Sequence, residues 1–466
     1  MCVFTQIKVV PRESVLEQDV FFITKEKVMK QYQVPRGTQD IFGLDVLKWH
    51  KIEGLIKEIT QVYGYVEVRT PEFEHTEVFA RENDASDVVN KEMYTFMDRG
   101  ERSLTLKPEG TAGVIRALVE NKWFNQADLP LKYYYLSPCF RYERPQKGRM
   151  RIHHQFGVEV IGEKSAYMDA EVIGLGMTIV RTLGLEDLKV LINTLGDQES
   201  REIYTHHLKE HFKDTVMDLC PDCQRRYEQN PLRILDCKVD AEHVALKTAP
   251  RLQDSLNQAS KDYFDLVVKI LKDSGVEVEV SDRLVRGLDY YTHTVFEVVS
   301  VHQSMGSQST VFGGGRYDNL VRDLGGPELS GIGFGMGIER LLVALEAENV
   351  QLVEAEGIDV FSISLDEKAL DYAYHLTQYL RLNGYKADYD VYKKSFKSQF
   401  KTLERKGAKV AILLGEEEMK KNQVVLKLQS TQEQVTVSEA EILHQLDHWL
   451  NEDHVCDHDH GGHTHE

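Results

Sequence analysis

The stretch Leu131–Gly162, LKYYYLSPCFRYERPQKGRMRIHHQFGVEVIG, decides the fold of this chain. Both of its ends are rich in aromatic and β-branched residues, which favours strands, whereas the loop from Pro145 to Gly148 is polar. Two strands joined by such a loop form a hairpin. We therefore expect a long antiparallel hairpin at the middle of a large domain.

The segments around this hairpin carry helix and strand patterns in alternation. The apolar positions from Val46 to Tyr63 fit an amphipathic helix, and YGYVEVRTPEFEH then alternates like a strand until Pro71 interrupts it. Residues 104–120 predict a strand, a turn and a helix. Residues 276–300 are strand-like throughout, and GIGFGMGIERLLVAL after the glycine-rich FGGGRYDNL predicts a strand that enters a helix.

The 466 residues are enough for two to four domains. Residues 32–350 hold the large antiparallel sheet and its flanking helices, with a helical insertion at about 200–272. Residues 357–450 alternate strands and helices, which predicts a small α/β domain. Residues 1–31 look like an N-terminal extension, and the polar, histidine-rich residues 451–466 are expected to be a disordered tail. The predicted class is therefore α+β.

Composition excludes several classes of protein. Hydrophobic residues make up 42% and charged residues 28%, which is ordinary globular usage. Neither a membrane-spanning run nor a secretory signal is apparent, so we expect a cytoplasmic protein without a membrane partner. The net charge of −19 would repel a polyanion at long range, so any nucleic-acid site must be a local basic patch. Lys393 to Lys409 is such a patch, although a solvated helix face would have the same composition.

Two groups of residues could hold a metal. Cys220, Cys223 and Cys237 have a spacing that suits tetrahedral zinc, but the fourth ligand is not obvious and His243 is the nearest candidate. Ordinary reduced cysteines in a helical insertion are therefore the favoured interpretation, and zinc is not expected to be required. The tail could capture zinc, nickel or copper weakly through Cys456 and its five histidines, without a physiological role following from this: His454, His458, His460, His463 and His465.

Arginines suggest a phosphate site in the large domain. Arg141 lies on the hairpin, where a guanidinium could grip a phosphate, while the basic loop beside it could meet a second anionic partner. A merely charged turn is the alternative. Arg340 follows the glycines of GIGFGMG at the start of a helix, where a ligand can approach the backbone closely.

Together these segments resemble the class II aminoacyl-tRNA synthetases. TPEFEHTEVF is similar to their first motif, FRYERPQKGR with HHQFGVEV to the second, and GFGMGIERL to the third. Within that class, RGLDYYTHTVFE (Arg286 to Glu297) and PEGT (Pro108 to Thr111) resemble histidyl-tRNA synthetase, from about Tyr32 to Leu450. The resemblance implies a class II antiparallel sheet, an anticodon-binding α/β domain and a homodimer.

The implied reaction activates L-histidine with ATP to histidyl-adenylate, releases pyrophosphate, and transfers the histidyl group to the terminal ribose of tRNA(His). Arg141 and Arg286 are the implied catalytic cations beside the α-phosphate, Arg340 completes the ATP site, and Mg²⁺ assists. No covalent protein intermediate is required. The residues implied to bind histidine are Glu109, Thr111, Gln155, Glu159, Tyr290 and Tyr291.

Physical chemistry agrees with these roles. Glu109 and Thr111 could accept the hydrogen bonds of an ammonium group, although a helix-capping turn has the same residues. Gln155 and Glu159 are four apart on a strand, so their side chains share a face. Tyr290 and Tyr291 could bind the imidazole, with packing in a strand as the alternative. The residues implied to contact tRNA are Arg144, Gln146, Lys147 and Arg149 on the hairpin loop and Lys393, Lys394, Lys397 and Lys401 in the small domain.

Two rival functions remain. A paralogue could keep the fold as a regulatory subunit of histidine biosynthesis and bind histidine without making adenylate. Such relatives tend to lose RGLDYY and the C-terminal domain, and this chain has both. Metal storage or delivery would rest on the tail alone. Ile152 and His153 also differ from the residues expected in the second motif, which leaves the detail of the pocket open.

Overall fold

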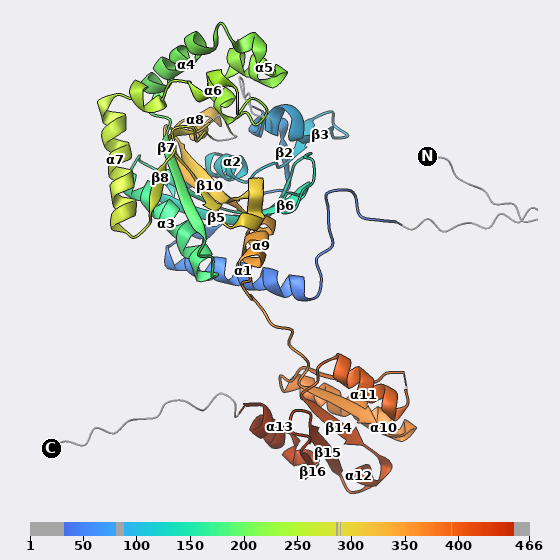
Figure 1. Cartoon of the computed structure of the whole chain (residues 1–466). Helices are drawn as coiled ribbons and strands as arrows, with labels where there is room; N and C mark the ends of the chain where they lie inside the picture. The colour runs from blue at the N-terminus through green and yellow to red at the C-terminus, as the bar shows by residue number, and fades with distance from the viewer. Residues whose placement is uncertain (1–31, 81–87, 286–287, 289, 393, 452–466) are drawn as a thin grey trace, which may run out of the picture. The chain divides into compact units, whose positions relative to one another are not determined.

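The computed structural model describes residues 32–80, 88–285, 288, 290–392 and 394–451. The predictions for Arg286, Lys393, the N-terminal extension and the histidine-rich tail fall outside these residues. The chain divides into two compact units, residues 1–352 and 353–466 (Figure 1). No described helix is both long and apolar enough to cross a bilayer.

The first unit is built on a sheet of eight strands. Their order is β1-β5-β6-β11-β10-β9-β7-β8, antiparallel except for the parallel edge pairs β1/β5 and β7/β8. The strands are β1 (Val66–Glu67), β5 (Leu131–Phe140), β6 (Ile152–Gly162), β7 (Leu188–Thr194), β8 (Val278–Val280), β9 (Thr292–Ser300), β10 (Thr310–Tyr317) and β11 (Ser330–Gly337).

The predicted central hairpin is confirmed as β5 and β6. Their register runs without interruption from Leu131 opposite Ile161 to Phe140 opposite Ile152. Strand β6 then pairs with β11 on its other side, so it lies in the interior of the sheet. Because side chains alternate along a strand, β6 presents Val158 and its even-numbered neighbours to one face and Glu159 and its odd-numbered neighbours to the other.

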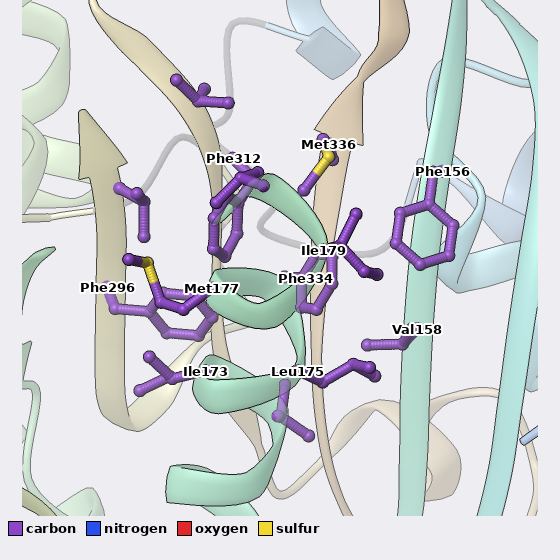
Figure 2. Packing of buried hydrophobic residues seen from close by; sticks show 14 of the residues in the cluster. Phe156, Val158, Ile173, Leu175, Met177, Ile179, Phe296, Phe312, Phe334 and Met336 are labelled. Atoms are coloured by element: carbon purple, nitrogen blue, oxygen red, sulfur yellow. The ribbon is translucent and has the colours of Figure 1, made fainter. Parts of the chain in front are cut away.

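The even face of β6 belongs to the main hydrophobic core. Helix α3 (Ala166–Thr182) lies across this face, and Figure 2 shows its Met177 and Ile179 among the aromatic rings of Phe296, Phe312 and Phe334. Helices α1 (Leu44–Val62) and α9 (Ile338–Ala347) add further apolar side chains to the same core. Apolar burial on this face supplies the main driving force for folding the sheet.

The odd face is covered differently. Helix α2 (Thr111–Asn121) and the short α8 (Leu320–Asp323) pack over Leu131 and Ile161 at one end of it. A separate sheet of order β2-β4-β3 stands beside α2. Its elements and their neighbours are β2 (Phe73–His75), η1 (Thr76–Val78), η2 (Val88–Glu92), β3 (Tyr94–Met97), β4 (Ser103–Leu106) and η3 (Trp123–Asn125).

The region between β7 and β8 is helical, as the sequence pattern indicates. Its core contains Tyr204, Phe212 and Leu246 together with Tyr291 and Val295 from β9 and the segment before it. The elements are α4 (Gln198–Phe212), η4 (Val216–Asp218), α5 (Pro221–Gln229), η5 (Pro231–Asp236), α6 (Val244–Lys247), η6 (Leu252–Ser255) and α7 (Gln258–Asp273), and η7 (Gln303–Gln308) follows β9.

The second unit confirms the predicted small α/β fold. Its five-stranded sheet has the order β13-β12-β14-β15-β16, with the first three strands parallel and the last two antiparallel. The last strand was not predicted. The elements are β12 (Val360–Ser364), α10 (Glu367–Leu382), β13 (Ala387–Tyr389), α11 (Phe396–Arg405), β14 (Val410–Leu414), α12 (Glu416–Lys420), β15 (Gln423–Leu428), β16 (Gln434–Ser438), η8 (Glu439–Glu441) and α13 (Ile442–Asn451).

The prediction of a strand throughout residues 276–300 was wrong. Strand β8 ends at Val280 and β9 begins only at Thr292, so Tyr290 and Tyr291 precede the strand. The segment between the strands begins with Ser281 and Asp282, polar residues that favour turns over ladder pairing. The two tyrosines are therefore not held by a strand's alternation of faces.

A buried ion pair ties α3 to β10 under this sheet. The Arg316 guanidinium is 1% exposed and donates to the fully buried Asp169 carboxylate and to Ser330 Oγ at 2.5 Å. Thr294 Oγ1 donates to the second Asp169 oxygen at 2.6 Å. Every polar atom of this carboxylate therefore has a partner, which is the condition under which a buried pair is tolerated.

Removal of one partner from this pair should be costly. We expect Arg316→Met to lower the free energy of unfolding by about 3–5 kcal/mol, because it leaves Asp169 charged and buried. Urea unfolding followed by circular dichroism measures the change. The control is Arg322→Met, whose exposed guanidinium lies 3.7 Å from Asp323 and should contribute under about 1 kcal/mol. Equal effects of the two variants would contradict this account of the pair.

Candidate functional site

A stripe of glycines makes room for polar side chains on the odd face of the sheet. Gly333 pairs with Glu159 across β11 and β6, and Gly335 pairs with Gly157. A Cβ atom added to Gly333 would lie 2.2 Å from Glu159 Oε2, and one added to Gly335 would lie 2.0 Å from Gln155 Nε2. The missing side chains of β11 thus leave the space into which Gln155 and Glu159 extend.

Helix α2 meets these two side chains with its N-terminus. The Glu109 carboxylate accepts the backbone N–H groups of Thr111 at 2.7 Å and Ala112 at 3.0 Å, so it caps the helix. Thr111 Oγ1 donates to Glu159 Oε1 at 2.6 Å, and the N–H of Gly110 donates to Gln155 Oε1 at 3.0 Å. Hydrogen bonds therefore join Glu109, Thr111 and Glu159 directly, and Gln155 joins the same cluster through Gly110.

Three tyrosines, Tyr290, Tyr291 and Tyr317, pack at this cluster. Tyr317 at the end of β10 donates its phenol proton to Glu159 Oε2 at 2.5 Å, and its ring packs edge-on against Tyr290 with 5.7 Å between centroids. Tyr290 in turn lies 4.8 Å from the ring of Tyr291. Burial, followed by the charges of Glu109 and Glu159 among others, raises the pKa of Tyr290. Both predicted tyrosines thus lie at the cluster.

Sequence reasoning missed Tyr317. The available signal was the run Gly313–Gly315 directly before Arg316 and Tyr317, because glycines inside a strand mark places where other groups approach closely. The partner of Tyr317 is 158 residues away in the chain, so local pattern could not identify it.

Glu159 is the most strongly perturbed acid of the cluster. It is fully buried, and burial raises its pKa to about 8 despite the hydroxyl groups of Thr111 and Tyr317 that hydrogen-bond to it. A cation placed beside this carboxyl group would favour its ionised form, in which both oxygens accept hydrogen bonds. The cluster is suited to contact a ligand with a positively charged group.

A second, cationic region lies next to the first. Arg141 Nε donates to the carbonyl oxygen of Pro108 at 2.8 Å, which brings the guanidinium beside the segment that carries Glu109. Arg340 on α9 donates to the carbonyl oxygen of Thr310 at 3.1 Å. Burial, followed by the positive charges of Arg141 and Arg340 among others, lowers the pKa of His153 to about 3. His153 is therefore neutral, and the region suits an anion such as a phosphate.

The loop that joins β5 and β6 lies next to Arg340 in this region. Gln146 and Arg149 pair across the turn, and a Cβ atom at Gly148 would lie 3.4 Å from Arg340 Cα. Arg149 forms an ion pair with the buried Glu143, whereas Lys147 forms an exposed pair with Glu346 at 2.9 Å. The loop carries the predicted tRNA contacts Arg144, Gln146, Lys147 and Arg149 next to Arg340.

The basic patch of the second unit includes an exposed pair of lysines on α11. Lys397 and Lys401 are exposed and one turn apart on α11. Lys394 lies 3.5 Å from Asp390, and Lys406 and Lys409 are paired with Asp388 and Asp359. Exposed aromatic side chains adjoin the patch at Tyr392 and Phe396.

The three predicted cysteines come together in the insertion. The sulfur atoms of Cys220, Cys223 and Cys237 and one carboxylate oxygen of Asp240 all lie within 4.8 Å of one another. His243, the fourth ligand considered from the sequence, instead caps α6, where its Nδ1 accepts the N–H of Ala245 at 3.2 Å. Asp240 carries no local signal that would distinguish it from other exposed acids.

Comparison with family models gives two matches. Residues 37–341 match the model described as histidyl-tRNA synthetase, and residues 358–449 match that of the anticodon binding domain. The first match covers all the pocket residues described above. The second covers the lysine patch on α11.

Comparison with curated proteins gives relatives over nearly the whole chain. A histidine–tRNA ligase of Bacillus velezensis is 49% identical over 89% of this chain and 98% of that protein. The histidine–tRNA ligase of Bacillus subtilis is 48% identical over the same shares.

Comparison with solved structures agrees. The apo histidyl-tRNA synthetase of Staphylococcus aureus covers 89% of this chain and 100% of its own, with a TM-score of 0.77 and 41% identity. A Bacillus halodurans structure titled as an ATP phosphoribosyltransferase regulatory subunit/histidyl-tRNA synthetase has a TM-score of 0.57 and 21% identity, with 80% of this chain and 96% of its own covered. That second likeness shows the fold alone.

The glycine stripe gives a structural prediction. Gly333→Ala should lower the free energy of unfolding by about 1–3 kcal/mol, because the new methyl group would meet the Val158 carbonyl oxygen at 2.2 Å as well as Glu159. Urea unfolding measures this. Gly337→Ala, on the same face of β11, is the control, since its Cβ atom would meet only Arg340 Cβ at 3.8 Å. If both variants are as stable as the parent, the pocket is wider than described.

Proposed function

The chain belongs to the histidyl-tRNA synthetase family, and we propose from this premise how its described pocket divides the reaction among individual residues. Its activity is that of a class II histidine–tRNA ligase. It activates L-histidine with ATP, transfers the histidyl group to the 3′-terminal ribose of tRNA(His), and releases AMP and pyrophosphate.

The observation that carries the residue assignment is the buried cluster around Glu159. Histidine brings an ammonium group and an imidazole, and Glu109, Thr111, Gln155 and Glu159 offer acidic and hydrogen-bonding groups for them within one cluster. Tyr290 and Tyr291 lie beside it, where a phenol can hydrogen-bond the imidazole. A site of this kind rejects apolar side chains of similar size, because they would leave its buried polar groups unpaired.

The adenylation step needs stabilisation of negative charge rather than a nucleophilic side chain. A carboxylate oxygen of histidine attacks the α-phosphorus of ATP, a new oxygen–phosphorus bond forms, and the bond to pyrophosphate breaks. Arg141 lies beside the segment that holds Glu109, so it can contact the α-phosphate of a ligand bound there. Arg340 is assigned to ATP, and Arg286, which lies outside the described residues, is assigned to the α-phosphate by the resemblance to the family.

The site also fits Mg²⁺. Mg²⁺ prefers one or two carboxylates together with substrate phosphates, and it would neutralise charge on ATP. Glu297 on β9 accepts a hydrogen bond from Thr310 Oγ1 at 3.3 Å, and Arg340 contacts the carbonyl oxygen of the same threonine. Glu297 thus lies near the proposed phosphate site, and its carboxylate would hold the ion.

Two surfaces are proposed for tRNA. The hairpin loop with Arg144, Gln146, Lys147 and Arg149 would meet the acceptor end, since it adjoins Arg340 at the proposed ATP site. In the second unit, Lys397 and Lys401 would contact phosphates of the anticodon arm while Tyr392 and Phe396 offer rings for stacking. Lys393 and Lys394 remain part of the same proposed surface.

Residues 32–350 would form the catalytic domain, with the insertion at about 200–272, and residues 357–450 the anticodon-binding domain. Assembly as a homodimer and work in the cytoplasm, where charged tRNA is consumed, are also proposed. Closed two-fold pairing is the commonest assembly of such chains.

A regulatory subunit without ligase activity is the rival function. The likeness to the structure with the regulatory title favours it only at the level of fold. Against it stand the close relatives named as ligases and the presence of both the RGLDYY segment and the C-terminal unit.

One assay tests both activity and the pocket. The chain should catalyse histidine-dependent exchange of pyrophosphate into ATP, and Glu159→Gln should weaken histidine binding while the protein stays folded. Because the pKa of Glu159 is raised to about 8, a bound cation should displace its proton. Histidine affinity should therefore rise with pH between 7 and 8, by less than roughly tenfold per unit.

Calorimetry in two buffers of different ionisation enthalpy counts the released protons directly. We expect proton release on histidine binding at pH 7 in the parent and none that involves this site in Glu159→Gln. Glu163→Gln, an exposed acid just after β6, is the control and should behave like the parent. Identical proton release in all three proteins would contradict a role of Glu159 in histidine binding. Lack of exchange in folded parent protein would contradict the ligase activity.

The lysine patch is tested separately. Lys397→Glu with Lys401→Glu should raise the KM for tRNA about tenfold or more and reduce the salt dependence of binding by about two phosphate contacts. Pyrophosphate exchange should be unchanged, because it needs no tRNA. Lys421→Glu, an exposed lysine of the same unit, is the control. Loss of exchange in the double variant would show a structural fault rather than a tRNA contact.

A further inference from the structure

The insertion holds a cluster of three thiols and a carboxylate whose arrangement the ligase reaction does not explain. Cys220 Sγ lies 3.7 Å from Cys237 Sγ, and Cys237 Sγ lies 3.6 Å from Asp240 Oδ2. Cys223 is fully buried at the same point. We propose that Cys220, Cys223, Cys237 and Asp240 form a structural zinc site.

The distances agree with one tetrahedral ion. Zinc binds thiolate sulfur at about 2.3 Å and carboxylate oxygen at about 2.0 Å, so tetrahedral ligands lie about 3.8 Å apart for two sulfurs and about 3.5 Å for sulfur and oxygen. The separations of 3.7 Å between Cys220 Sγ and Cys237 Sγ and of 3.6 Å between Cys237 Sγ and Asp240 Oδ2 match these values. A disulfide would instead require about 2.05 Å between sulfurs and would leave the third thiol unused.

The local backbone explains how the ligands converge. Cys220 is the N-cap of α5, Pro221 occupies its first turn, and Cys223 is the third helical residue, a spacing that places both side chains on one side of the helix start. Cys237 ends η5, and the turn after it returns Asp240 to the cluster.

Backbone N–H groups complete the surroundings of the ligands. The N–H of Asp240 donates to Cys237 Sγ at 3.4 Å, and the N–H of Cys220 donates to Asp240 Oδ2 at 3.0 Å. Hydrogen bonds of this kind orient metal ligands and offset the negative charge of bound thiolates. Three soft sulfurs and one carboxylate oxygen are all ligands that zinc accepts, and four protein ligands are the number that a structural zinc site uses.

A structural ion fits the needs of this region. The elements that carry the cluster are short: α5 has nine residues and η5 has six. Short helices are marginal by themselves, and a metal ion that joins the segments 220–223 and 237–240 would add binding free energy to the folded state without a large core.

The cluster is also connected to the hairpin. Asp222, between the first two cysteines, forms an ion pair with Lys91 at 2.8 Å, and the carbonyl oxygen of the adjacent Glu92 accepts the N–H of Tyr142 at 2.7 Å. Tyr142 follows Arg141. Loss of zinc should therefore loosen the support of Arg141 and lower the rate of exchange more than it alters the KM for histidine.

The histidine-rich tail would confuse metal analysis, so the test uses the full chain with His454, His458, His460, His463 and His465 replaced by Asn and Cys456 by Ser. This protein, isolated without added metal, should contain about one zinc per chain by atomic emission. Cys223→Ser and Asp240→Asn in the same background should lose it. Glu242→Gln, an exposed acid two residues away, should keep it.

Cobalt gives a readout that does not depend on activity. Co²⁺ in place of zinc should show the intense visible bands of a tetrahedral site and thiolate charge-transfer absorption, both reduced in Asp240→Asn. Circular dichroism establishes that each variant is folded. If Cys223→Ser fails to fold, the partly exposed Asp240→Asn and the cobalt spectrum of the parent decide the question.

Three results would overturn the site. They are zinc that persists in Asp240→Asn and Cys223→Ser, failure of reduced parent protein to take up zinc or cobalt, and a disulfide between Cys220 and Cys237 in freshly isolated protein. Exchange measured on the same samples keeps this proposal distinct from the ligase activity, because zinc-free protein that still exchanges pyrophosphate remains a ligase.

Discussion

The constraint on which the pocket depends is the burial of a carboxyl group inside a sheet. Glu159 lies in an interior strand, fully covered, with hydroxyl groups of Thr111 and Tyr317 on its two oxygens. An ionised carboxylate without a cation is costly in such a place, so its pKa is raised to about 8. A cationic ligand would relieve this cost, and the proposed recognition of histidine rests on that relief.

The same requirement explains why β11 is rich in glycine. Side chains at Gly333 and Gly335 would occupy the space of Glu159 and Gln155, so the strand forgoes cross-strand packing on that face. The opposite face of the sheet supplies the packing that this face lacks. Phe312 and Phe334 pack there against α3 (Figure 2), and the Arg316–Asp169 pair fastens the same helix to β10. Stability is concentrated on one face of the sheet and binding on the other.

This division shows what sequence could and could not predict. Alternation within one strand was enough to place Gln155 and Glu159 together, and the polar loop between apolar runs was enough for the hairpin. The Tyr317–Glu159 contact and the Arg316–Asp169 pair join residues 158 and 147 positions apart, so no local pattern contains them. Asp240 was missed because the spacing of the three cysteines does not identify the residue that would be the fourth ligand.

The distribution of charge reconciles an acidic chain with anionic substrates. The whole chain carries −19, yet Arg141 and Arg340 lie near enough to His153 to depress its pKa to about 3, after burial itself. Glu109 directly follows Pro108, whose carbonyl oxygen accepts a hydrogen bond from Arg141. Glu159 is joined to the same segment through Thr111. The site is therefore negative where an amino acid's ammonium group would bind and positive where a phosphate would bind. Histidyl-adenylate has the complementary polarity, so its orientation would be fixed by charge before any hydrogen bond to the imidazole selects histidine.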